Sequence, residues 1–343
     1  MNDSRTNNTV TIAVCTYNAE VFIDHCLKTI LDQDVDPRRM KILLVDDGST
    51  DGTVNKLQVC KQKSRFECQV IANDTNRGLT SVRYEAIEAA DTDFIGFIDS
   101  DDWVDVSYCR KMLGVADRSG ADIIACDFTR SWMKSGANRY LSSGSKDAME
   151  AFSEIMKGRG HFPLWPKFIR KGILKEINKY FDPKTDARFD VSKKTDDMTY
   201  SPLTYAFAQN VAYVDEILHY VGNQPNHITA VWDKSKKNRV LASVQSMNSI
   251  DFMVDVMKKR GIWNKYKRTC TPYIVNQMVA FLDRCIENDM TATETDKLMM
   301  QAHEKHILDY VFLYGDLYEK GAVMKRLLKL ASNRHGKNRL NII

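Results

Sequence analysis

The segment Asp99-Ser100-Asp101-Asp102 places three carboxylates within four positions, directly after the apolar run Phe94–Ile98. Carboxylates this close repel one another unless they are protonated or bound to a cation, and ligands that are all oxygen suit Mg²⁺ or Mn²⁺. Such an ion keeps some of its waters and bridges phosphate oxygens. The cluster therefore predicts a divalent metal site for a ligand that carries phosphate.

A second acidic pair, Asp46-Asp47, follows the apolar run Lys41–Val45. Turn chemistry accounts equally well for this pair, because Asp-Gly sequences fill tight turns and Asp caps helices. In an open α/β sheet, however, the carboxyl ends of parallel strands meet at one edge, where loops converge on ligands. We therefore expect both acidic groups to lie at the same edge of a sheet.

The elements that would position these groups can be recognised in the first 130 residues, which alternate short β-rich runs with amphipathic helical stretches such as Val21–Leu31. This alternation is typical of βαβ units and predicts an α/β fold with a mostly parallel sheet flanked by helices. The polar segment Arg130–Lys146 is predicted to be a loop. The expected strands are Val10–Cys15, Lys41–Val45, Gln69–Ala72, Phe94–Ile98 and Asp122–Phe128.

The last hundred residues have a different pattern. Apolar residues keep a helical period in Val240–Met257, Tyr273–Ile286 and Leu298–Phe312, which predicts a helical C-terminal appendage. From Lys320 to Ile343 there are seven Lys and Arg residues and no acidic residue. An apolar face that includes Val323 and Leu327 accompanies these charges, as in a helix that lies on anionic lipid, although packing against the protein explains the same pattern equally well.

Composition narrows the classes of function. The chain has 343 residues, 43% of them hydrophobic, as in a soluble, well-cored protein. A net charge of +4 is too small to indicate nucleic acid as the main partner. No apolar run is long enough to cross a membrane, and Met1–Val10 lacks the apolar centre of a secretory signal, so we expect a cytoplasmic protein. The eight cysteines show no zinc spacing and are expected to be reduced.

Four motifs in order give the sequence a close resemblance to glycosyltransferase family 2, whose fold is called GT-A. They are Thr16-Tyr17-Asn18 after the first expected strand, Val45–Asp51 after the second, Asn76-Arg77-Gly78-Leu79, and the Asp-x-Asp motif Asp99-Ser100-Asp101. The resemblance implies a GT-A fold and an inverting, metal-dependent enzyme that takes a sugar from a nucleotide-diphosphate donor. Any one motif alone would be weak.

The resemblance also implies roles for individual residues. Tyr17, flanked by Thr16 and Asn18, would offer an aromatic face to the nucleotide base, and Asp47, beside Asp46, would accept a hydrogen bond from a ring N–H. Asp101 would hold Mn²⁺ or Mg²⁺, with Asp99 near the ribose or a metal-bound water and Ser100 between them. Arg77 and Arg83 are candidate phosphate ligands. Arg83 is ranked below the aspartates, since a solvated surface role suits it equally well and the family usually has Arg-Asn where this chain has Arg83-Tyr84.

An inverting transfer needs a base that takes the proton of the acceptor hydroxyl. The family places it in an acidic pair about a hundred residues after the metal motif, which is matched here by Asp196-Asp197. We take Asp197 as the base; a helix N-cap with acidic first-turn residues is the alternative. The arginine that commonly follows near the phosphates is missing, and His227 is a candidate for contact with the metal or the diphosphate instead.

Together these observations predict a catalytic domain over residues 1–230, with a nucleotide-sugar-binding half at 1–130 and an acceptor half at 131–230, followed by a helical region at 231–343. The predicted activity is hexosyl or N-acetylhexosaminyl transfer, with UDP as the expected nucleotide, onto a glycan or lipid-linked glycan in surface polysaccharide synthesis. The basic C-terminus suggests peripheral contact with the inner face of the membrane. The alternatives are a non-catalytic nucleotide-sugar-binding scaffold and, less favoured, a sugar nucleotidyltransferase, which would normally show a Gly-rich phosphate loop.

Overall fold

The computed structural model describes residues 7–130, 146–158, 162–189, 196–222, 236–290, 295 and 317–332. By its internal contacts the chain divides into two units. The first comprises Met1–Ser192 and Tyr200–Gln224, and the second comprises Lys193–Thr199 and Pro225–Ile343. Each unit is described by itself.

The first unit is built on a mixed sheet, of which nine strands lie within the described ranges. The strands β3, β2, β1 and β4 are parallel, as are β6 and β9, whereas β8 runs antiparallel to both of its neighbours. In order across the sheet they are β3 (Glu67–Ala72), β2 (Met40–Asp46), β1 (Val10–Thr16), β4 (Phe94–Phe97), β8 (Lys167–Arg170), β6 (Ile123–Arg130), β9 (Asn210–Val221) and β5 (Trp103–Val104); β7 (Lys146–Asp147) pairs with β9.

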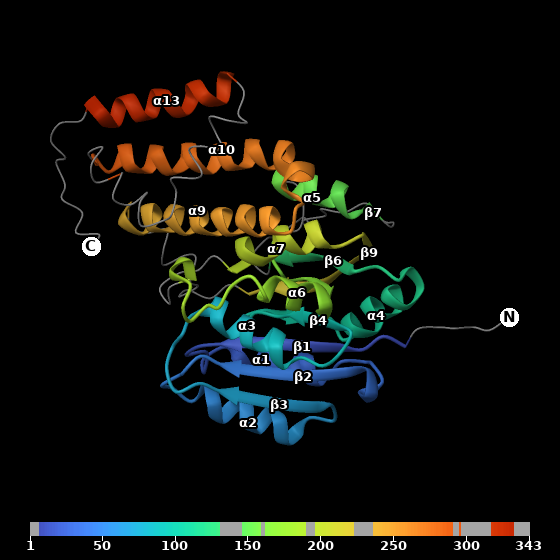
Figure 1. Ribbon diagram of the computed structural model, residues 1–343. Coiled ribbons are helices and arrows are strands. Elements are labelled where there is room, and N and C mark those ends of the chain that lie inside the picture. The colour runs from blue at the N-terminus through green and yellow to red at the C-terminus, as the bar shows by residue number, and fades with distance from the viewer. Residues whose placement is uncertain are drawn as a thin grey trace. The chain divides into compact units, whose positions relative to one another are not determined.

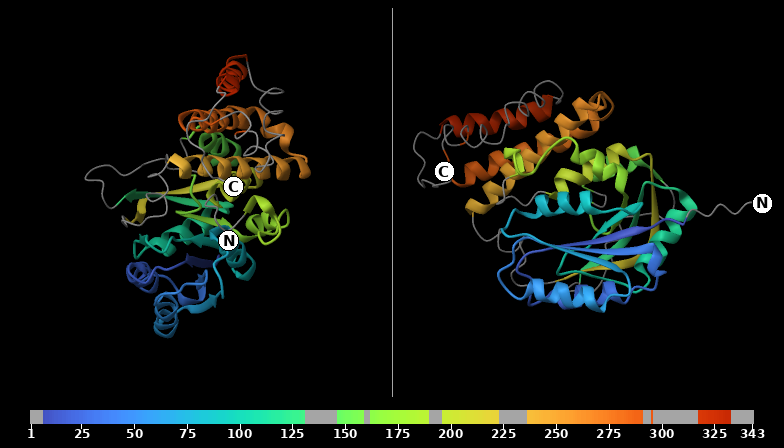
Figure 2. Two further views of the ribbon diagram at one scale, coloured as in Figure 1. Left: turned by 90° about the vertical axis from the view of Figure 1, so that its left-hand side faces the viewer. Right: turned by 60° about the horizontal axis from the view of Figure 1, so that its bottom comes forward.

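Helices cover both faces of this sheet (Figure 2). The strand β1 is buried along its whole length, as its run of apolar and β-branched residues predicts for a central parallel strand. Because side chains alternate along a strand, Val10, Ile12 and Val14 share one face, where they pack with α1, α2 and α4. The helices of this unit are α1 (Ile23–Leu31), α2 (Thr53–Lys63), α3 (Leu79–Ala89), α4 (Tyr108–Ser119), α5 (Ala148–Met156) and α6 (Lys171–Asn178), with the 3₁₀ turns η1 (Pro37–Arg39) and η2 (Ala187–Phe189).

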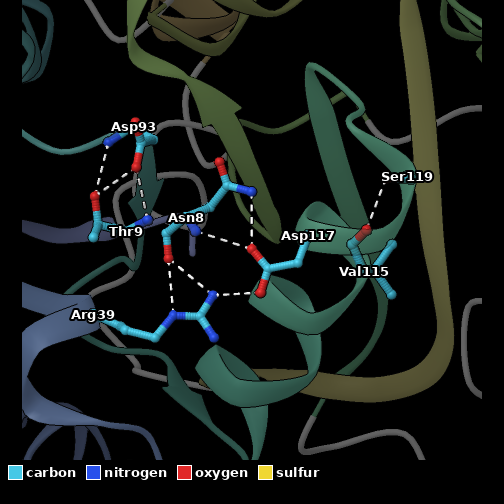
Figure 3. Close-up of polar contacts among 7 residues, drawn as sticks. All are labelled: Asn8, Thr9, Arg39, Asp93, Val115, Asp117 and Ser119. Atoms are coloured by element: carbon cyan, nitrogen blue, oxygen red, sulfur yellow. Dashed lines mark hydrogen bonds and ion pairs between the residues drawn. The ribbon is translucent and has the colours of Figure 1, made fainter. Parts of the chain in front are cut away.

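A polar cluster fixes the amino end of β1 (Figure 3). Arg39 donates to the carbonyl oxygen of Asn8 and, over 2.7 Å, to the carboxylate of Asp117 on α4. The same carboxylate accepts the backbone and side-chain N–H groups of Asn8, both at 2.9 Å. Beside it, Asp93 accepts from the amide and hydroxyl of Thr9. The start of β1 is thereby tied to η1, to α4 and to the turn before β4.

The second unit is helical. Its long helices α9 (Lys236–Lys259) and α10 (Trp263–Glu287) pack on each other, and α13 (Leu317–Ser332) packs on α10 (Figure 1). The two carboxylate oxygens of Asp283 on α10 accept a forked pair of bonds from Arg326 on α13, at 2.7 and 2.8 Å. No helix within the described ranges is both long enough and apolar enough to span a membrane. The helix α7 (Asp196–Phe207) contributes residues to both units.

The predicted fold class is confirmed. All five expected strands are present, with ends that differ by a residue or two, and C-terminal helices follow the sheet domain. The mixed region after Lys146 contains β7, α5, β8, α6, α7 and β9, which the sequence did not resolve into elements. The predicted loop lies almost wholly outside the described residues, and the predicted helix Leu298–Phe312 lies entirely outside them.

Substitutions at two adjacent arginines test whether the polar cluster stabilises the fold. Arg39 and Asp117 retain only 19% and 15% of their side-chain exposure, whereas Arg38 is 88% exposed in its pair with Asp36. Arg39→Ala should lower the free energy of unfolding by about 1–3 kcal/mol, because it removes charged hydrogen bonds to partly buried acceptors. Arg38→Ala should leave stability unchanged, since exposed pairs contribute little. Urea unfolding of both variants measures the difference, and equal losses would contradict the anchoring role of Arg39.

Candidate functional site

The order of the strands reverses direction at β1. The chain runs from β1 outward to β2 and β3, then returns to place β4 on the other side of β1. The loops that follow β1 and β4 therefore diverge, and ligands of open α/β sheets bind at such a reversal, outside the carboxyl ends of the strands. The predicted donor residues from Thr16 to Asn18, Asp46-Asp47 and Asp99 to Asp102 all follow strands at this edge. The structure brings these three groups together.

The turn after β1 is bonded to the turn after β2. Asn18 has a positive φ of 47°, a conformation that Asn tolerates better than most residues. Its amide donates to the Ser49 hydroxyl over 2.8 Å, and its side-chain oxygen accepts the amide of Thr50 over 2.9 Å. Ser49 in turn donates its own amide to Asp46, which is fully buried. Asn18 and Asp46 thus fix the two turns, while the neighbouring Tyr17 stays 47% exposed.

Asp47 holds a third loop. Its two carboxylate oxygens accept the backbone amides of Arg77 and Gly78, over 2.7 and 2.8 Å. Burial raises the pKa of Asp47 above its usual value, and the two amide donors oppose that rise. Gly48 has a φ of 73°, and a Cβ there would lie 2.5 Å from the carbonyl carbon of Thr75, so only glycine fits. A carboxylate oxygen has a second acceptor position, which leaves room for the ring N–H that the sequence assigns to Asp47.

The two candidate arginines differ in their surroundings. Arg83 on α3 is buried, with 2% of its side chain exposed, and it donates to Asp99 over 2.8 Å. Its guanidinium also lies over the ring of Phe97. The solvated surface role that the sequence left open for Arg83 is wrong, because the side chain is buried. A charge buried this deeply needs a partner, and Asp99 is one. Arg77 forms an ion pair with Glu85 over 2.7 Å, and its backbone amide is what reaches Asp47.

Two carboxylates of the acidic loop accept hydrogen bonds from the protein itself. Asp102 is buried, and its carboxylate bonds to the His219 side chain over 2.8 Å and to the Gly222 amide over 2.9 Å. Asp99 pairs with Arg83. Protein donors thus bond to Asp99 and Asp102, and the cation inferred from repulsion among the carboxylates stays a prediction. The sequence reasoning missed His219 and Gly222, which both bond to the Asp102 carboxylate.

The remaining donor set still suits a divalent ion. Asp99 and Asp101 are partly exposed oxygen ligands on one short loop. Within the described ranges no group of three or more His, Cys, Asp or Glu side chains is arranged to hold a metal. Mg²⁺ and ions of similar chemistry are commonly held by one or two carboxylates together with water and substrate phosphates, so two carboxylates fit such an ion. His227, the third metal candidate, lies outside the described residues.

Aromatic rings support the acidic loop from β9. Trp103 of β5 pairs with Tyr220 in register, and their rings stack at 5.9 Å. Trp165 stacks on His219 at 4.9 Å. The sequence showed an aromatic segment at 219–229 but gave no sign that its first residues reach back to Asp102, because the partners are more than a hundred positions apart.

The candidate base begins helix α7. Asp196 is the first residue of the helix, and the Asp197 side chain is half-buried. By their contacts both residues belong to the second unit, within Lys193–Thr199, whereas the rest of the helix belongs to the first. The catalytic role of Asp197 stays a prediction.

Comparison with known proteins agrees with this geometry. Residues 11–178 match the profile of the family described as "Glycosyl transferase family 2". A putative glycosyltransferase, EpsH, of Bacillus subtilis is 29% identical over 219 residues, which are 62% of this chain and 60% of that protein. The poly(ribitol-phosphate) beta-N-acetylglucosaminyltransferase TarS of Staphylococcus aureus is 23% identical over 61% of this chain and 34% of its own length. The chain thus spans about 60% or less of the length of these two relatives.

Solved structures share the fold. The crystal structure of S. aureus TarS 1–349 in complex with UDP-GlcNAc has a TM-score of 0.56 and 15% sequence identity, covering 91% of this chain and 92% of that one. A mannosyltransferase from Pyrobaculum calidifontis, in complex with GDP-Man and Mn²⁺, has a TM-score of 0.50 and 12% identity, covering 96% and 88%. The ordered motifs, the GT-A sheet and the family match together identify residues 11–178 of this chain as a glycosyltransferase family 2 domain.

Proposed function

We propose that the chain is an inverting glycosyltransferase that moves a sugar from a UDP-sugar to a glycan or lipid-linked glycan in surface polysaccharide synthesis. The observation that carries this proposal is the convergence of three loops on the carboxyl edge of the sheet: the turn with the exposed Tyr17, the turn with Asp47, and the Asp99–Asp102 loop. The choice of UDP is supported by the fold shared with the TarS structure that holds UDP-GlcNAc. N-acetylglucosamine or glucose is accordingly a candidate sugar.

Each end of the donor has residues suited to it. The exposed ring of Tyr17 offers a face on which uracil stacks, and the Asp47 carboxylate accepts its ring N–H. Asp101, with Asp99, would hold Mn²⁺ or Mg²⁺ near the diphosphate. When bound, that ion would offset the negative charge of the leaving diphosphate. Arg83 donates a hydrogen bond to Asp99 and places its positive charge next to the same loop.

The acceptor hydroxyl needs a base across the sugar from the diphosphate, and we assign this role to Asp197. The match of Asp196-Asp197 to the acidic pair of the family supports the assignment. The non-catalytic scaffold is disfavoured because Asp99, Asp101 and Asp197 are all present. The nucleotidyltransferase is disfavoured because the turn after β1, Thr16–Asn18, is not Gly-rich.

The exposed side of α13 supports a peripheral membrane contact. Met324 and Leu328, one helical turn apart, are 44% and 64% exposed, and Lys325 and Lys329 are exposed beside them. Val323 is buried, and Arg326 bonds to Asp283 of α10, so the inner side of the helix is used in packing. Apolar side chains flanked by lysines match the requirement of a helix on an anionic surface. A lipid-linked acceptor would then be within reach of the enzyme.

The metal assignment is tested by Asp101→Ala. Isothermal titration with UDP should show that Mn²⁺ raises the affinity of the unaltered protein, and that the variant binds UDP equally weakly with and without Mn²⁺. Asp93→Ala, at the opposite end of β4, is the control and should keep the metal effect, because the recorded bonds of the Asp93 carboxylate are to Thr9, away from the acidic loop. A folded Asp101→Ala protein that retains the Mn²⁺ effect would remove Asp101 from the site.

The base assignment is tested by Asp197→Asn, which keeps the size of the side chain and removes its basicity. Donor binding should be unchanged, and the rate of sugar transfer should fall by at least about a hundredfold, the usual contribution of a positioned base. Asp196→Asn is the matched control and should stay active. Loss of transfer in the Asp196 variant alone would assign the base to Asp196.

The membrane contact is tested by charge reversal. Lys325→Glu with Lys329→Glu should sharply reduce sedimentation with phosphatidylserine vesicles at low salt, because each basic residue near an anionic bilayer contributes about 1 kcal/mol of attraction. Lys61→Glu with Lys63→Glu, two exposed lysines on α2, is the matched control and should sediment normally. High salt should release the unaltered protein. Equal sedimentation of the two double variants would rule out α13 as the contact.

A further inference from the structure

The end of β9 is built against the acidic loop at several points. Val104 pairs with His219, one position away from the pair of Trp103 with Tyr220. His219 and the Gly222 amide together occupy both oxygens of the Asp102 carboxylate. A Cβ on Gly222 would lie only 1.9 Å from the carbonyl oxygen of Asp101. The absence of a side chain at Gly222 therefore allows β9 to lie directly against the backbone of the loop.

His219 is fully buried, and its ring is oriented by two contacts. One face stacks on Trp165, with an angle of 11° between the ring planes. The Nε2 atom bonds to Asp102, and because a carboxylate only accepts, Nε2 must carry the proton in this bond. The other nitrogen, Nδ1, has no hydrogen-bond partner within the described part of the chain. The one recorded polar bond of the ring is therefore to Asp102, the residue that follows Asp101.

We propose that His219 is a positioning residue for the metal-binding loop, acting through Asp102 on Asp101. The proposal rests on the proposed function, since it assigns the loop a metal ion. The bond between His219 and Asp102 prevents the loop from turning about its own backbone, and the contact of Gly222 with Asp101 limits movement toward β9. With both constraints present, the backbone that carries Asp101 is held in place before any ligand arrives.

A purely packing role for His219 makes a different prediction, so the experiment compares two substitutions. His219→Phe keeps a flat ring against Trp165 and removes the donor, whereas His219→Gln keeps an N–H donor near the position of Nε2. Thr92→Val is the matched control, because it removes buried hydroxyl bonds, to Thr11 and to the Phe94 carbonyl, at the opposite end of the sheet. The probe is Mn²⁺ titrated in the presence of UDP, with free Mn²⁺ followed by electron paramagnetic resonance.

We expect His219→Phe to weaken Mn²⁺ binding by about 10–100-fold, the usual effect of losing a group that orients metal ligands. His219→Gln should recover most of that loss, and Thr92→Val should bind normally. Hydrogen exchange without ligand should show faster exchange at the amides of Asp102 and Gly222 in His219→Phe and near-normal exchange in His219→Gln. Both amides are protected in the structure, by the Asp99 carbonyl and the Asp102 carboxylate.

Two results would overturn the proposal. One is Mn²⁺ binding and amide exchange in His219→Phe that match those of the unaltered protein. The other is an equal defect in the Phe and Gln variants, which would mean that ring packing, rather than the donated bond, is what matters. If the unaltered protein binds no Mn²⁺ with UDP, the proposed function fails, and the exchange rates of Asp102 and Gly222 still decide whether His219 holds the loop.

Discussion

Buried carboxylates at the carboxyl edge of the sheet impose the constraint on which the rest of the site depends. A carboxylate removed from water must accept hydrogen bonds, and at this edge the donors come from other segments of the chain. Asp47 takes two amides from the loop before α3, and Asp102 takes its donors from His219 of β9 and from Gly222 just after it. Asp99 takes its donor from Arg83 on α3. Each carboxylate thus ties its loop to another segment of the chain.

This arrangement explains how a site made of loops can be rigid before it binds ligand. A transferase gains from groups that already point to where charge will develop, because no reorganisation is then needed during the reaction. The turns after β1 and β2 are bonded through Asn18 and Ser49, and the Tyr17 ring, next to Asn18 in the first turn, stays exposed. The opposite end of β1 is fixed separately by Arg39 and Asp117, so the central strand is held at both ends.

The same bonds also change how many carboxylates of the acidic motif would face a cation. In the sequence alone, the segment from Asp99 to Asp102 suggests that several carboxylates surround one cation. In the folded chain Asp102 faces inward to His219, and Asp99 is shared with Arg83. A divalent ion at this loop would therefore depend on water and on the phosphates of the donor for most of its ligands. Coupling of this kind would make metal and donor binding mutually dependent.

The sequence by itself determined the fold class, the positions of five strands and the family, because these rest on local periodicity and on short motifs whose residues are close along the chain. It also indicated that Asp46-Asp47 and the Asp99–Asp102 loop lie at one sheet edge, since parallel strands end together. Only the tertiary structure decided which charges are compensated. Arg83 looks like a surface residue in a helical pattern, yet the approach of α3 to β4 buries it on Asp99. His219 lies 117 positions from Asp102, and only the pairing of β5 with β9 brings the two side chains together. A contact between residues so far apart leaves no periodic pattern in a single sequence, because it depends on how the strands are ordered in the sheet.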